Sequence, residues 1–571
     1  MKTKEKIYLI SILALVLALN CYYLSLKSGY YVDEGMTMVL ANGTYNGTVT
    51  SRSEYGIGDF LTAYVFKSGD NLLDVISNVK GMLNDLSHSG NYSKQGTVEW
   101  YDAARSMLQG KSQWMTGRDL RDQIVAEKGS RFQYKQVYIN QALDVHPIFY
   151  YVLVHTIFSI FPDTYSNAFL FCINIIFLLL SLIVLYKIVK NYWKDDENTA
   201  LIAVILWGFS QGFASCAVYF RMYAVLTFFI LMTLYVHLMI ITDWEGFNDY
   251  KSRWIVLAIS VWLGFNTQYY FILFMAPLFV ITCIVMWKQK KILKRYIKCM
   301  LITAMISLLV WPFSVYHILF GYRGTEAMAN VLSTGIVDKL IKCVDVFDIA
   351  LIGGVTGGML VAIATVIAYF VLYRKQIAKN RGIYLVSTIP GIIYLILVAQ
   401  IAPTVSDRYL MCIFPLMIGL LSVSLSGVIR YVIKNRRYGN VLLVVCCLII
   451  VIFNIVLEKP NYLYLEQKDN VMYLQGDKAD YNCLMIGYDH GQGFSEILKL
   501  SEYANVLVVG QQEMDMVSPP HDSQMDKMVI YVFDGLDVEE VLKQAENKLE
   551  ISGNIFQINS DIESFSAFVY E

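Results

Sequence analysis

Apolar stretches of about 20 residues recur along most of this chain, and they constrain its fold more than any other feature. A helix needs roughly 20 mainly apolar residues to cross the hydrocarbon core of a bilayer. The qualifying stretches are 7–26, 165–188, 199–218, 222–241, 254–287, 298–319, 348–373, 382–401, 409–428 and 440–457. The stretch 254–287 is long enough for two spans, broken at the polar Asn266-Thr267-Gln268. We therefore predict a polytopic α-helical membrane protein with about eleven spans.

Charge and cysteine content exclude several other classes of protein. Only 16% of the residues are charged and 56% are hydrophobic, so the chain has too few charges to cover the surface of a soluble protein of this size. A formal net charge of -1 argues against a nucleic-acid partner. Nine of the ten cysteines lie in or beside apolar segments, Cys483 being the exception. Neither a disulfide framework nor a zinc site is predicted.

Basic residues in the short loops predict the orientation. The run 7–26 exceeds a signal-peptide core and lacks a cleavage site after it, so it is expected to stay as a first span. Lysine and arginine are retained on the cytoplasmic side. They occur at every second connection, as Lys187, Lys190 and Lys194; Lys251 and Arg253; Lys288 to Lys298; Arg374 to Arg381; and Arg430 to Arg437. We expect a multi-pass protein of the plasma membrane with its N-terminus in the cytoplasm.

One apolar segment, 147–161, is too short to span and would invert this orientation if it did. We interpret it as a helix lying in the outer membrane interface, which its aromatic residues favour. Pro147 suits the first position of that helix, and Asp144 is expected to cap it.

Two parts of the chain are predicted to lie outside the membrane on the non-cytoplasmic face. The outer loop 27–146 is expected to belong with the transmembrane domain, 1–460, and the tail 461–571 is expected to be a small α/β domain. Helix-like patches in the loop are Leu72–Leu86 and Val98–Leu108, and the tail has expected strands at Cys483–Gly487, Ala504–Val509 and Met528–Phe533 and an exposed helix at Val538–Leu549.

An adjacent carboxylate pair, Asp33-Glu34, follows the first span by about seven residues. Two neighbouring carboxylates repel one another and face a reduced dielectric at an interface, which raises the pKa of at least one of them. Such a group is suited to act as a general base. The alternative is an acidic, solvated start of a loop.

Three arginines, Arg221, Arg323 and Arg408, fall on the outer side, against the positive-inside bias. The guanidinium group presents a fixed fork of donors that fits phosphate. Arginines between outer span ends are therefore candidates to bind a lipid phosphate. The alternative for each one is a side chain that extends to the membrane interface.

Other polar and aromatic residues accompany these arginines on the predicted outer face. Asp144 and His146 are candidates to line a site or to bind a divalent cation, although one carboxylate and one imidazole are a weak metal signal. Gln268-Tyr269-Tyr270 ends a span and is equally typical of an aromatic belt. Asp489-His490 in the tail is typical of a turn.

Taken in order, these motifs resemble the GT-C superfamily of membrane glycosyltransferases, especially the branch of protein O-mannosyltransferases and aminoarabinose lipid A transferases (glycosyltransferase family 39). The family pattern begins with an acidic pair and a His-Pro-Pro-Leu-Tyr-Tyr helix. It continues with Arg-x-Tyr, a His-Tyr-Tyr-like element and Arg-Tyr followed by Pro. The matching residues are Asp33-Glu34, His146-Pro147-Ile148-Phe149-Tyr150-Tyr151, Arg221-Met222-Tyr223, Gln268-Tyr269-Tyr270 and Arg408-Tyr409 with Pro415. Ile148 stands where the pattern has its second proline. Gln268 stands where the pattern has a histidine, which puts a histidine metal ligand at that position in doubt.

The resemblance implies an inverting glycosyltransferase that moves a sugar from a polyprenyl-phosphate donor to an acceptor hydroxyl at the outer face. It implies Asp33 as the base, with Glu34 orienting it or tuning its pKa. Arg221 and Arg408, with Arg323, would hold the donor phosphate, and Asp144, His146, Tyr223, Gln268, Tyr269 and Tyr409 would line the substrate site. No cofactor is required, and a divalent cation is left open. The implied partners are the bilayer, the lipid-linked donor and an acceptor glycan, lipid or protein.

A polytopic transporter or flippase of a lipid-linked or cell-envelope substrate is the alternative function. Transporters carry ionisable residues near the membrane midplane. The notable charges here cluster at the outer face instead. A non-catalytic envelope scaffold would explain the tail but gives the outer arginines no role.

Overall fold

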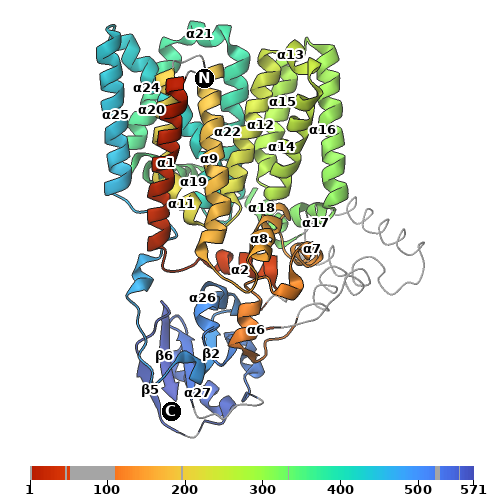
Figure 1. Ribbon diagram of the computed structural model, residues 1–571, viewed down its shortest axis with the longest axis vertical. Helices are drawn as coiled ribbons and strands as arrows, with labels where there is room; N and C mark the ends of the chain where they lie inside the picture. Colours follow the sequence, from red (N-terminus) through yellow and green to blue (C-terminus); the bar gives the residue numbers. More distant parts are fainter. Residues whose placement is uncertain are drawn as a thin grey trace, which may run out of the picture. The chain divides into compact units, whose positions relative to one another are not determined.

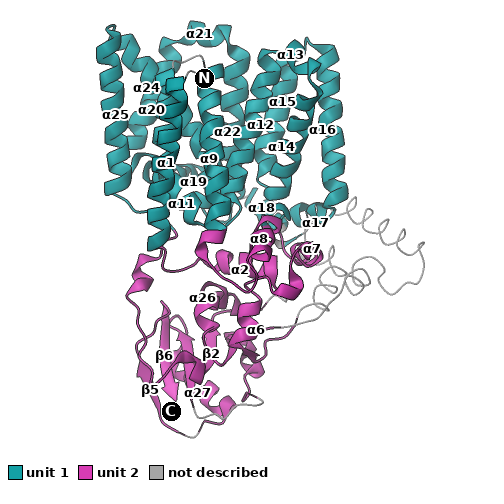
Figure 2. Cartoon of the chain, in the orientation of Figure 1, with its two compact units in different colours: residues 1–26, 146–150, 170–461 teal, residues 27–145, 151–169, 462–571 magenta. Residues whose placement is uncertain are grey.

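The chain divides into two compact units in the computed structural model (Figure 2). Unit 1 comprises residues 1–26, 146–150 and 170–461, and unit 2 comprises residues 27–145, 151–169 and 462–571. The structure describes residues 3–44, 48–51, 110–193, 197–319, 321–331, 334–520, 527–551 and 553–570. Unit 1 holds the apolar helices, and unit 2 holds the sheet.

Unit 1 is built from long apolar helices that run side by side (Figure 1). They are α1 (Thr3–Leu26), α9 (Asn167–Tyr192), α10 (Glu197–Gly208), α11 (Gln211–Val218), α12 (Tyr223–Thr242), α14 (Lys251–Thr267), α15 (Phe271–Val285), α16 (Lys290–Val310), α20 (Gly358–Leu372), α22 (Arg381–Ile401), α24 (Phe414–Val432) and α25 (Arg436–Val456). Each predicted span contains at least one of them, so the polytopic helical fold is confirmed.

Six described helices are long and apolar enough to cross a membrane, and two bent pairs also qualify when each pair is taken together. These pairs are α10 with α11, bent by 52°, and α16 with α17 (Phe313–Leu319), bent by 94°. Helices α15 and α20 are apolar but shorter. The number eleven therefore stays a prediction, although the positions of the stretches agree with the helices.

The predicted span 298–319 is straight only as far as Val310. Trp311 leaves the helical region with φ -133° and ψ 72°, and α17 then turns away. Pro312 explains the break, because its ring disfavours a helical backbone at the residue before it and it has no N–H to continue the ladder. The bend puts α17 at one end of unit 1 rather than within the span.

Short helices lie at both ends of unit 1 (Figure 1). Helices α13 (Trp244–Asp249) and α21 (Arg374–Lys379) lie at one end, and α17, α18 (Tyr322–Val331) and α19 (Ile336–Phe347) lie at the other. The basic helix α21 and the lysine-rich start of α16 share the first end. This separation agrees with the alternation of basic connections, and the orientation in the cell stays a prediction.

Unit 2 contains a six-stranded sheet in the order β1-β3-β2-β4-β6-β5. Strand β2 pairs in parallel with β3 and β4, whereas β6 pairs antiparallel with β4 and β5. All six residues of β2 are buried, as expected for a strand covered on both faces. The strands are β1 (Met115–Thr116), β2 (Asn482–Gly487), β3 (Asn505–Gly510), β4 (Met528–Phe533), β5 (Ile555–Ile558) and β6 (Phe565–Tyr570), and the tail helices are α26 (Gly493–Leu500) and α27 (Val538–Leu549).

The predicted tail elements agree with this sheet. The apolar runs at 483–487, 504–509 and 528–533 form β2, β3 and β4, and the helix at 538–549 has the predicted bounds. A small α/β domain in the tail is therefore confirmed. The sequence analysis missed α26, β5 and β6.

The outer loop folds with the tail rather than with the helices of unit 1. Met115 in β1 pairs with Val506 in β3, and helix α2 (Val32–Asn42) packs against α26. The packing is close, because a Cβ atom added to Gly35 would lie 1.8 Å from the carbonyl oxygen of Phe494. The predicted division assigned the loop to the transmembrane domain, and in the structure it shares a compact unit with the tail.

The loop's other described helices are α6 (Gly117–Asp122), α7 (Tyr134–Leu143) and α8 (Phe149–Ile160). The predicted interfacial helix corresponds to α8, but it begins at Phe149 rather than Pro147. Asp144 ends α7 as its C-cap, with its N–H donated to the carbonyls of Asn140 and Gln141. The prediction that Asp144 caps the following helix is therefore wrong. The predicted patches 72–86 and 98–108 lie outside the described residues.

Candidate functional site

The carboxylate pair of unit 2 lies in the first turn of α2. Glu34 is fully buried, and its Oε2 accepts a 2.7 Å hydrogen bond from the N–H of Tyr31, which precedes the helix. This contact satisfies one of the donors that a helix start leaves without an intrahelical partner. Glu34 therefore fixes where α2 begins.

Lys27 completes the surroundings of Glu34. Its Nζ lies 3.0 Å from Oε1 and 3.2 Å from Oε2 of Glu34, and it donates a 2.7 Å hydrogen bond to the carbonyl oxygen of Tyr462. Burial lowers the pKa of Lys27, and the charge of Glu34 opposes that shift. The structure gives Glu34 a structural ion pair, whereas the sequence analysis had assigned it to orienting Asp33.

Asp33 has different surroundings from its neighbour. It is half-buried in the first turn of α2, and its backbone carbonyl accepts a hydrogen bond from the Thr37 hydroxyl. The partial positive charge at a helix start stabilises a carboxylate there. Of the two adjacent acids, Asp33 is the one whose side chain is partly accessible.

In unit 1, Arg221 occupies a break between two helices. Helix α11 ends at Val218 and α12 begins at Tyr223, and the N–H of Arg221 donates to the Tyr219 carbonyl two residues earlier. The side-chain amide of Asn174 on α9 donates to the same carbonyl at 2.7 Å. A buried asparagine thus replaces the hydrogen bonds that the broken helix loses.

The structure brings Arg221 and His146, two of the predicted site residues, into contact. Arg221 is only 3% exposed, and its Nη2 lies 3.2 Å from Nε2 of His146. Tyr223, the first residue of α12, is also buried and stacks on Tyr219 with ring centroids 5.8 Å apart. The junction therefore holds a buried cation beside an imidazole, and a buried pair of stacked tyrosines flanks that cation in the sequence.

Arg408 lies in the short helix α23 (Asp407–Leu410) of unit 1. Its guanidinium donates a 3.1 Å hydrogen bond to the Tyr409 hydroxyl and lies over the ring of the same tyrosine. The Tyr409 carbonyl accepts a 2.7 Å hydrogen bond from Tyr394, which fixes the backbone there. Packing thus restricts the orientation of this partly buried cation.

Tyr270 links Arg408 to the third arginine. Its ring lies 5.2 Å from the ring of Tyr409, and the charges of both Arg323 and Arg408 act on its hydroxyl. Arg323, however, is half-exposed on α18 and forms a 2.8 Å ion pair with Glu326. The structure therefore brings Arg323 and Arg408 to one region and leaves Arg323 the more solvated.

Tyr269 leads to a residue that the sequence analysis missed. Its hydroxyl accepts a 2.8 Å hydrogen bond from Trp311 and lies 2.9 Å from Nδ1 of His317, which is buried on α17. Gln268, which stands where the resembling family has a histidine, instead accepts a hydrogen bond from the Tyr269 N–H. His317 lies far from this motif in sequence, and its nearest signal is the helix-breaking Trp311-Pro312.

Lys27 and Asn174 were missed as well. Lys27 gave a usable signal, because it follows the first span on the predicted outer side and so opposes the positive-inside bias. Asn174 is one polar residue inside a long apolar stretch, and the sequence gives no indication of its partners.

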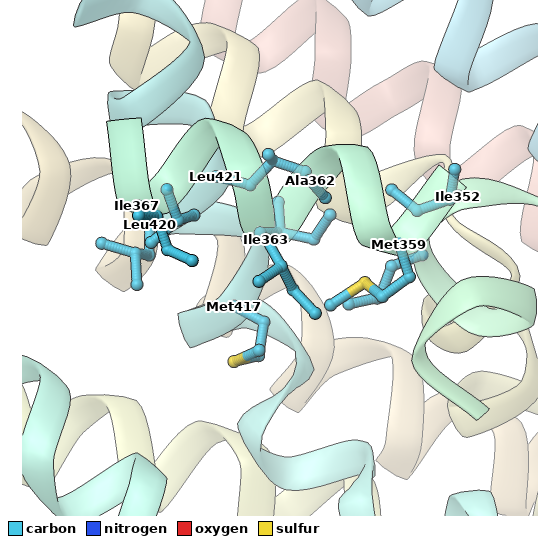
Figure 3. Close-up of a pocket in the computed structure, with 11 residues that line it drawn as sticks. Ile352, Met359, Ala362, Ile363, Ile367, Met417, Leu420 and Leu421 are labelled. Atoms are coloured by element: carbon cyan, nitrogen blue, oxygen red, sulfur yellow. The ribbon is translucent and has the colours of Figure 1, made fainter. Parts of the chain in front are cut away.

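Two pockets of unit 1 adjoin the π-helix Asp348–Ile352. One, of about 200 Å³, is partly polar; its lining includes Gln211, Ser215, Ser406, Asp407, Lys459 and Asn461. The other, of about 120 Å³, is apolar and is lined by side chains of the π-helix, α20 and α24, among them Ile352, Met359, Ile363, Ile367, Met417 and Leu421 (Figure 3). A partly polar and an apolar pocket thus share one short segment.

A protein site for a metal ion usually needs three or more ligating side chains close together. Among the described residues, no group of three or more His, Cys, Asp or Glu side chains is arranged to hold a metal ion.

In a comparison with known protein families, one segment of the chain matches a described family. Residues 145–316 match the family described as dolichyl-phosphate-mannose-protein mannosyltransferase, and they include His146, Arg221, Tyr223, Gln268 and Tyr269. This match confirms the resemblance inferred from those motifs. A search of the curated proteins finds no match.

Solved structures give more distant similarities. ArnT from Cupriavidus metallidurans bound to undecaprenyl phosphate is 10% identical, with a TM-score of 0.44 over 74% of this chain and 88% of that chain. The oligosaccharyltransferase AglB from Archaeoglobus fulgidus, in complex with an inhibitory peptide and a dolichol-phosphate, is 11% identical, with a TM-score of 0.38 over 72% of this chain and 65% of that chain.

Proposed function

We propose, because residues 145–316 relate this chain to the GT-C membrane glycosyltransferases, that it transfers a sugar from a polyprenyl-phosphate donor to an acceptor hydroxyl. The reaction would take place at the outer face of the plasma membrane. The observation that carries the proposal is the buried guanidinium of Arg221, held against His146 within the matched segment. A guanidinium group presents a fixed fork of donors that matches the oxygens of a phosphate.

The proposed reaction inverts the anomeric carbon. The acceptor oxygen forms a bond to that carbon while the bond from carbon to the phosphate oxygen breaks. The acceptor proton passes to Asp33, which acts as the general base. The phosphate leaves on its polyprenyl chain as a monoester, and the second pKa of such a group is about 6. Its negative charge therefore rises from one toward two.

The arginines act on this growing charge. A cation fixed beside the phosphate stabilises the transition state more than the ground state, which is the condition for acceleration. Arg221 and Arg408 have this role in the proposal, because packing holds each guanidinium in place. Arg323 contributes less, since it is half-exposed and paired with Glu326.

The remaining assignments follow from the surroundings of each residue. His146, Tyr223 and Tyr409 support the two arginines, and Gln268 and Tyr269 line the site near His317. Asp144 is assigned to the substrate site only by its place in the motif. The partly polar pocket lined by Asp407 has the chemistry to take a sugar, and the apolar pocket between α20 and α24 has the chemistry to take part of an isoprenoid chain.

The deciding experiment is transfer by the purified full-length protein. Membranes or nanodiscs are incubated with a panel of radiolabelled polyprenyl-phosphate sugars, and label is followed in glycan, lipid and protein fractions. We expect Asp33→Asn to abolish transfer while expression is retained. Asp515→Asn is the matched control, because Asp515 is an almost fully exposed aspartate of the same unit.

Full transfer by Asp33→Asn would reject Asp33 as the base. Movement of an intact lipid-linked sugar across the bilayer, with no transfer from any donor, would favour the transporter or flippase alternative. The product fraction that carries the label would also identify the acceptor class.

A further inference from the structure

Five consecutive residues of unit 2, Arg131-Phe132-Gln133-Tyr134-Lys135, are all exposed. They are nevertheless held in place by α8. Ser159 accepts hydrogen bonds from the Arg131 side chain and from the Phe132 N–H, and the Tyr134 hydroxyl bonds to Thr156. The segment therefore displays its side chains from a fixed backbone.

Phe132 adopts a backbone conformation that disfavours it. Its φ angle is +57°, in the left-handed region where a bulky side chain is an outlier. Its ring is 46% exposed, and the guanidinium of Arg131 lies over it. Packing among the described residues leaves about half of this aromatic side chain facing outward, so contacts within that part of the chain do not account for the strained conformation.

Further exposed apolar side chains adjoin this segment. Ile160 and Phe161, at the end of α8, are about half-exposed and follow Ser159, to which the segment is bonded. We name Arg131, Phe132, Tyr134, Lys135, Ile160 and Phe161 together the aromatic patch. Its apolar side chains are bordered by two basic ones, which is the composition of protein surfaces at membrane interfaces.

The patch is linked to a membrane-spanning helix by direct contact. Phe161 stacks on Phe169 with ring centroids 5.0 Å apart and ring planes inclined by 15°. Phe169 lies in the first turn of α9, a candidate membrane span. The patch therefore adjoins the first turn of a candidate membrane span.

We propose that the aromatic patch inserts into the membrane interface at the start of α9 and binds anionic phospholipid. Phe132, Tyr134, Ile160 and Phe161 would enter the boundary between headgroups and acyl chains, and Arg131 and Lys135 would contact lipid phosphates. The nearby Lys128 is not counted, because it pairs with Asp163. This inference does not depend on the proposed glycosyl transfer.

Lipid photolabelling of the full-length protein tests the proposal. The chain is reconstituted in phosphatidylcholine nanodiscs containing phosphatidylglycerol with a diazirine near its headgroup, irradiated, and mapped by peptide mass spectrometry. Adducts are expected on residues 131–135 and 160–161. Tyr473, Tyr488 and Phe556 are internal controls, because each is more exposed than Phe132 and lies in the same unit.

Two variants separate lipid contact from a structural role. Phe132→Asn keeps a residue that tolerates the left-handed region, so thermal stability in detergent is expected to hold or rise while labelling at 131–135 falls to the control level. Arg131→Gln and Lys135→Gln are each expected to lower labelling by phosphatidylglycerol by up to about fivefold, from the contribution of one basic residue at an anionic surface.

Equal labelling of the patch and the controls would overturn the proposal, since exposure alone would then determine adduct yield. Unchanged labelling in Phe132→Asn would overturn it too. Protein crosslinks at 131–135 with no lipid adducts would assign the surface to a protein partner instead.

Discussion

Two regions of this molecule hold ion pairs with almost the same geometry and different surroundings. Lys27 and Glu34 of unit 2 are 3.0 Å apart, and both side chains are 0% exposed. Arg323 and Glu326 of unit 1 are 2.8 Å apart, and their side chains are 47% and 38% exposed. Water screens the second pair and not the first, so contact distance alone does not determine what a pair contributes.

The same distinction separates the outer arginines, which are alike in sequence. Arg221 is almost completely buried in a helix break, whereas Arg323 extends from a half-exposed helix and has a carboxylate partner one turn away. A buried cation is costly unless something compensates it, and an exposed one is solvated. Substitutions of the buried and of the half-exposed charged residues test whether burial determines what each charge contributes.

Glu34→Gln is expected to have the largest effect on stability. It leaves the Lys27 ammonium buried without its carboxylate, and breaking such a pair typically costs about 3–5 kcal/mol. The measurement is the denaturant midpoint for proteolysis of unit 2 in the full-length protein. Glu326→Gln is the matched control and should cost no more than about 1 kcal/mol in the corresponding assay of unit 1.

The double variant Lys27→Met/Glu34→Leu sharpens this result. Removing both charges leaves no uncompensated ion, so much of the lost stability should return. Equal losses in Glu34→Gln and Glu326→Gln would show that burial does not distinguish the two pairs.

Arg221→Ala is expected to weaken donor binding most among the arginines. Truncating one partner of a buried charge pair costs about 2–5 kcal/mol, which corresponds to a Kd about 30-fold to several thousand-fold higher. The measurement is equilibrium binding of a polyprenyl phosphate to the reconstituted protein. Arg221→Lys should recover part of the affinity, because it keeps the charge and loses the fork.

Arg437→Ala is the control for Arg221, since Arg437 is an exposed arginine of the same unit. A donor Kd unchanged by Arg221→Ala would place Arg221 among arginines that only extend to the interface.

Arg408→Ala is expected to have an intermediate effect. Its guanidinium is partly buried and packed on Tyr409, and hydrogen bonds to charged groups contribute about 1.5–3 kcal/mol. The readout is kcat and Kd for the donor, measured separately. A change in kcat with an unchanged Kd would mean that Arg408 acts on the leaving phosphate rather than on donor binding.

Arg323→Ala should have the smallest effect, at most about 1 kcal/mol on donor binding. Salt provides the additional test, because the contribution of a solvated charge decreases as ionic strength rises. A loss as large as that of Arg221→Ala, and insensitive to salt, would contradict the comparison.

Local sequence patterns predicted much of the fold. The β-branched and aromatic run at Met528–Phe533 and the charge pattern at Val538–Leu549 predicted their elements with the observed bounds. Prediction failed where two local signals competed. Asp144-Val145-His146-Pro147 read as a helix start, but Asp144 ends the preceding helix, because its N–H completes the last turn of α7.

Contacts between residues far apart in the chain could not be predicted from local sequence patterns. Nothing near Met115 indicates that it pairs with Val506, and nothing near Gly35 indicates that α26 packs against it. The predicted division placed the loop with the transmembrane helices, whereas the structure groups the loop with the tail in one compact unit.

The sequence by itself determined where the helices lie, which connections carry the basic residues and that Asp33, His146, Arg221 and Arg408 belong to one ordered set of motifs. Each of those properties depends on residues that are close together in the sequence, so the order of residues along the chain is enough to determine it. Tertiary structure decided what each charge contacts. In the folded protein Glu34 pairs with Lys27, Arg221 is buried beside His146, and Arg323 stays half-exposed. Burial depends on groups that folding brings together from distant parts of the chain.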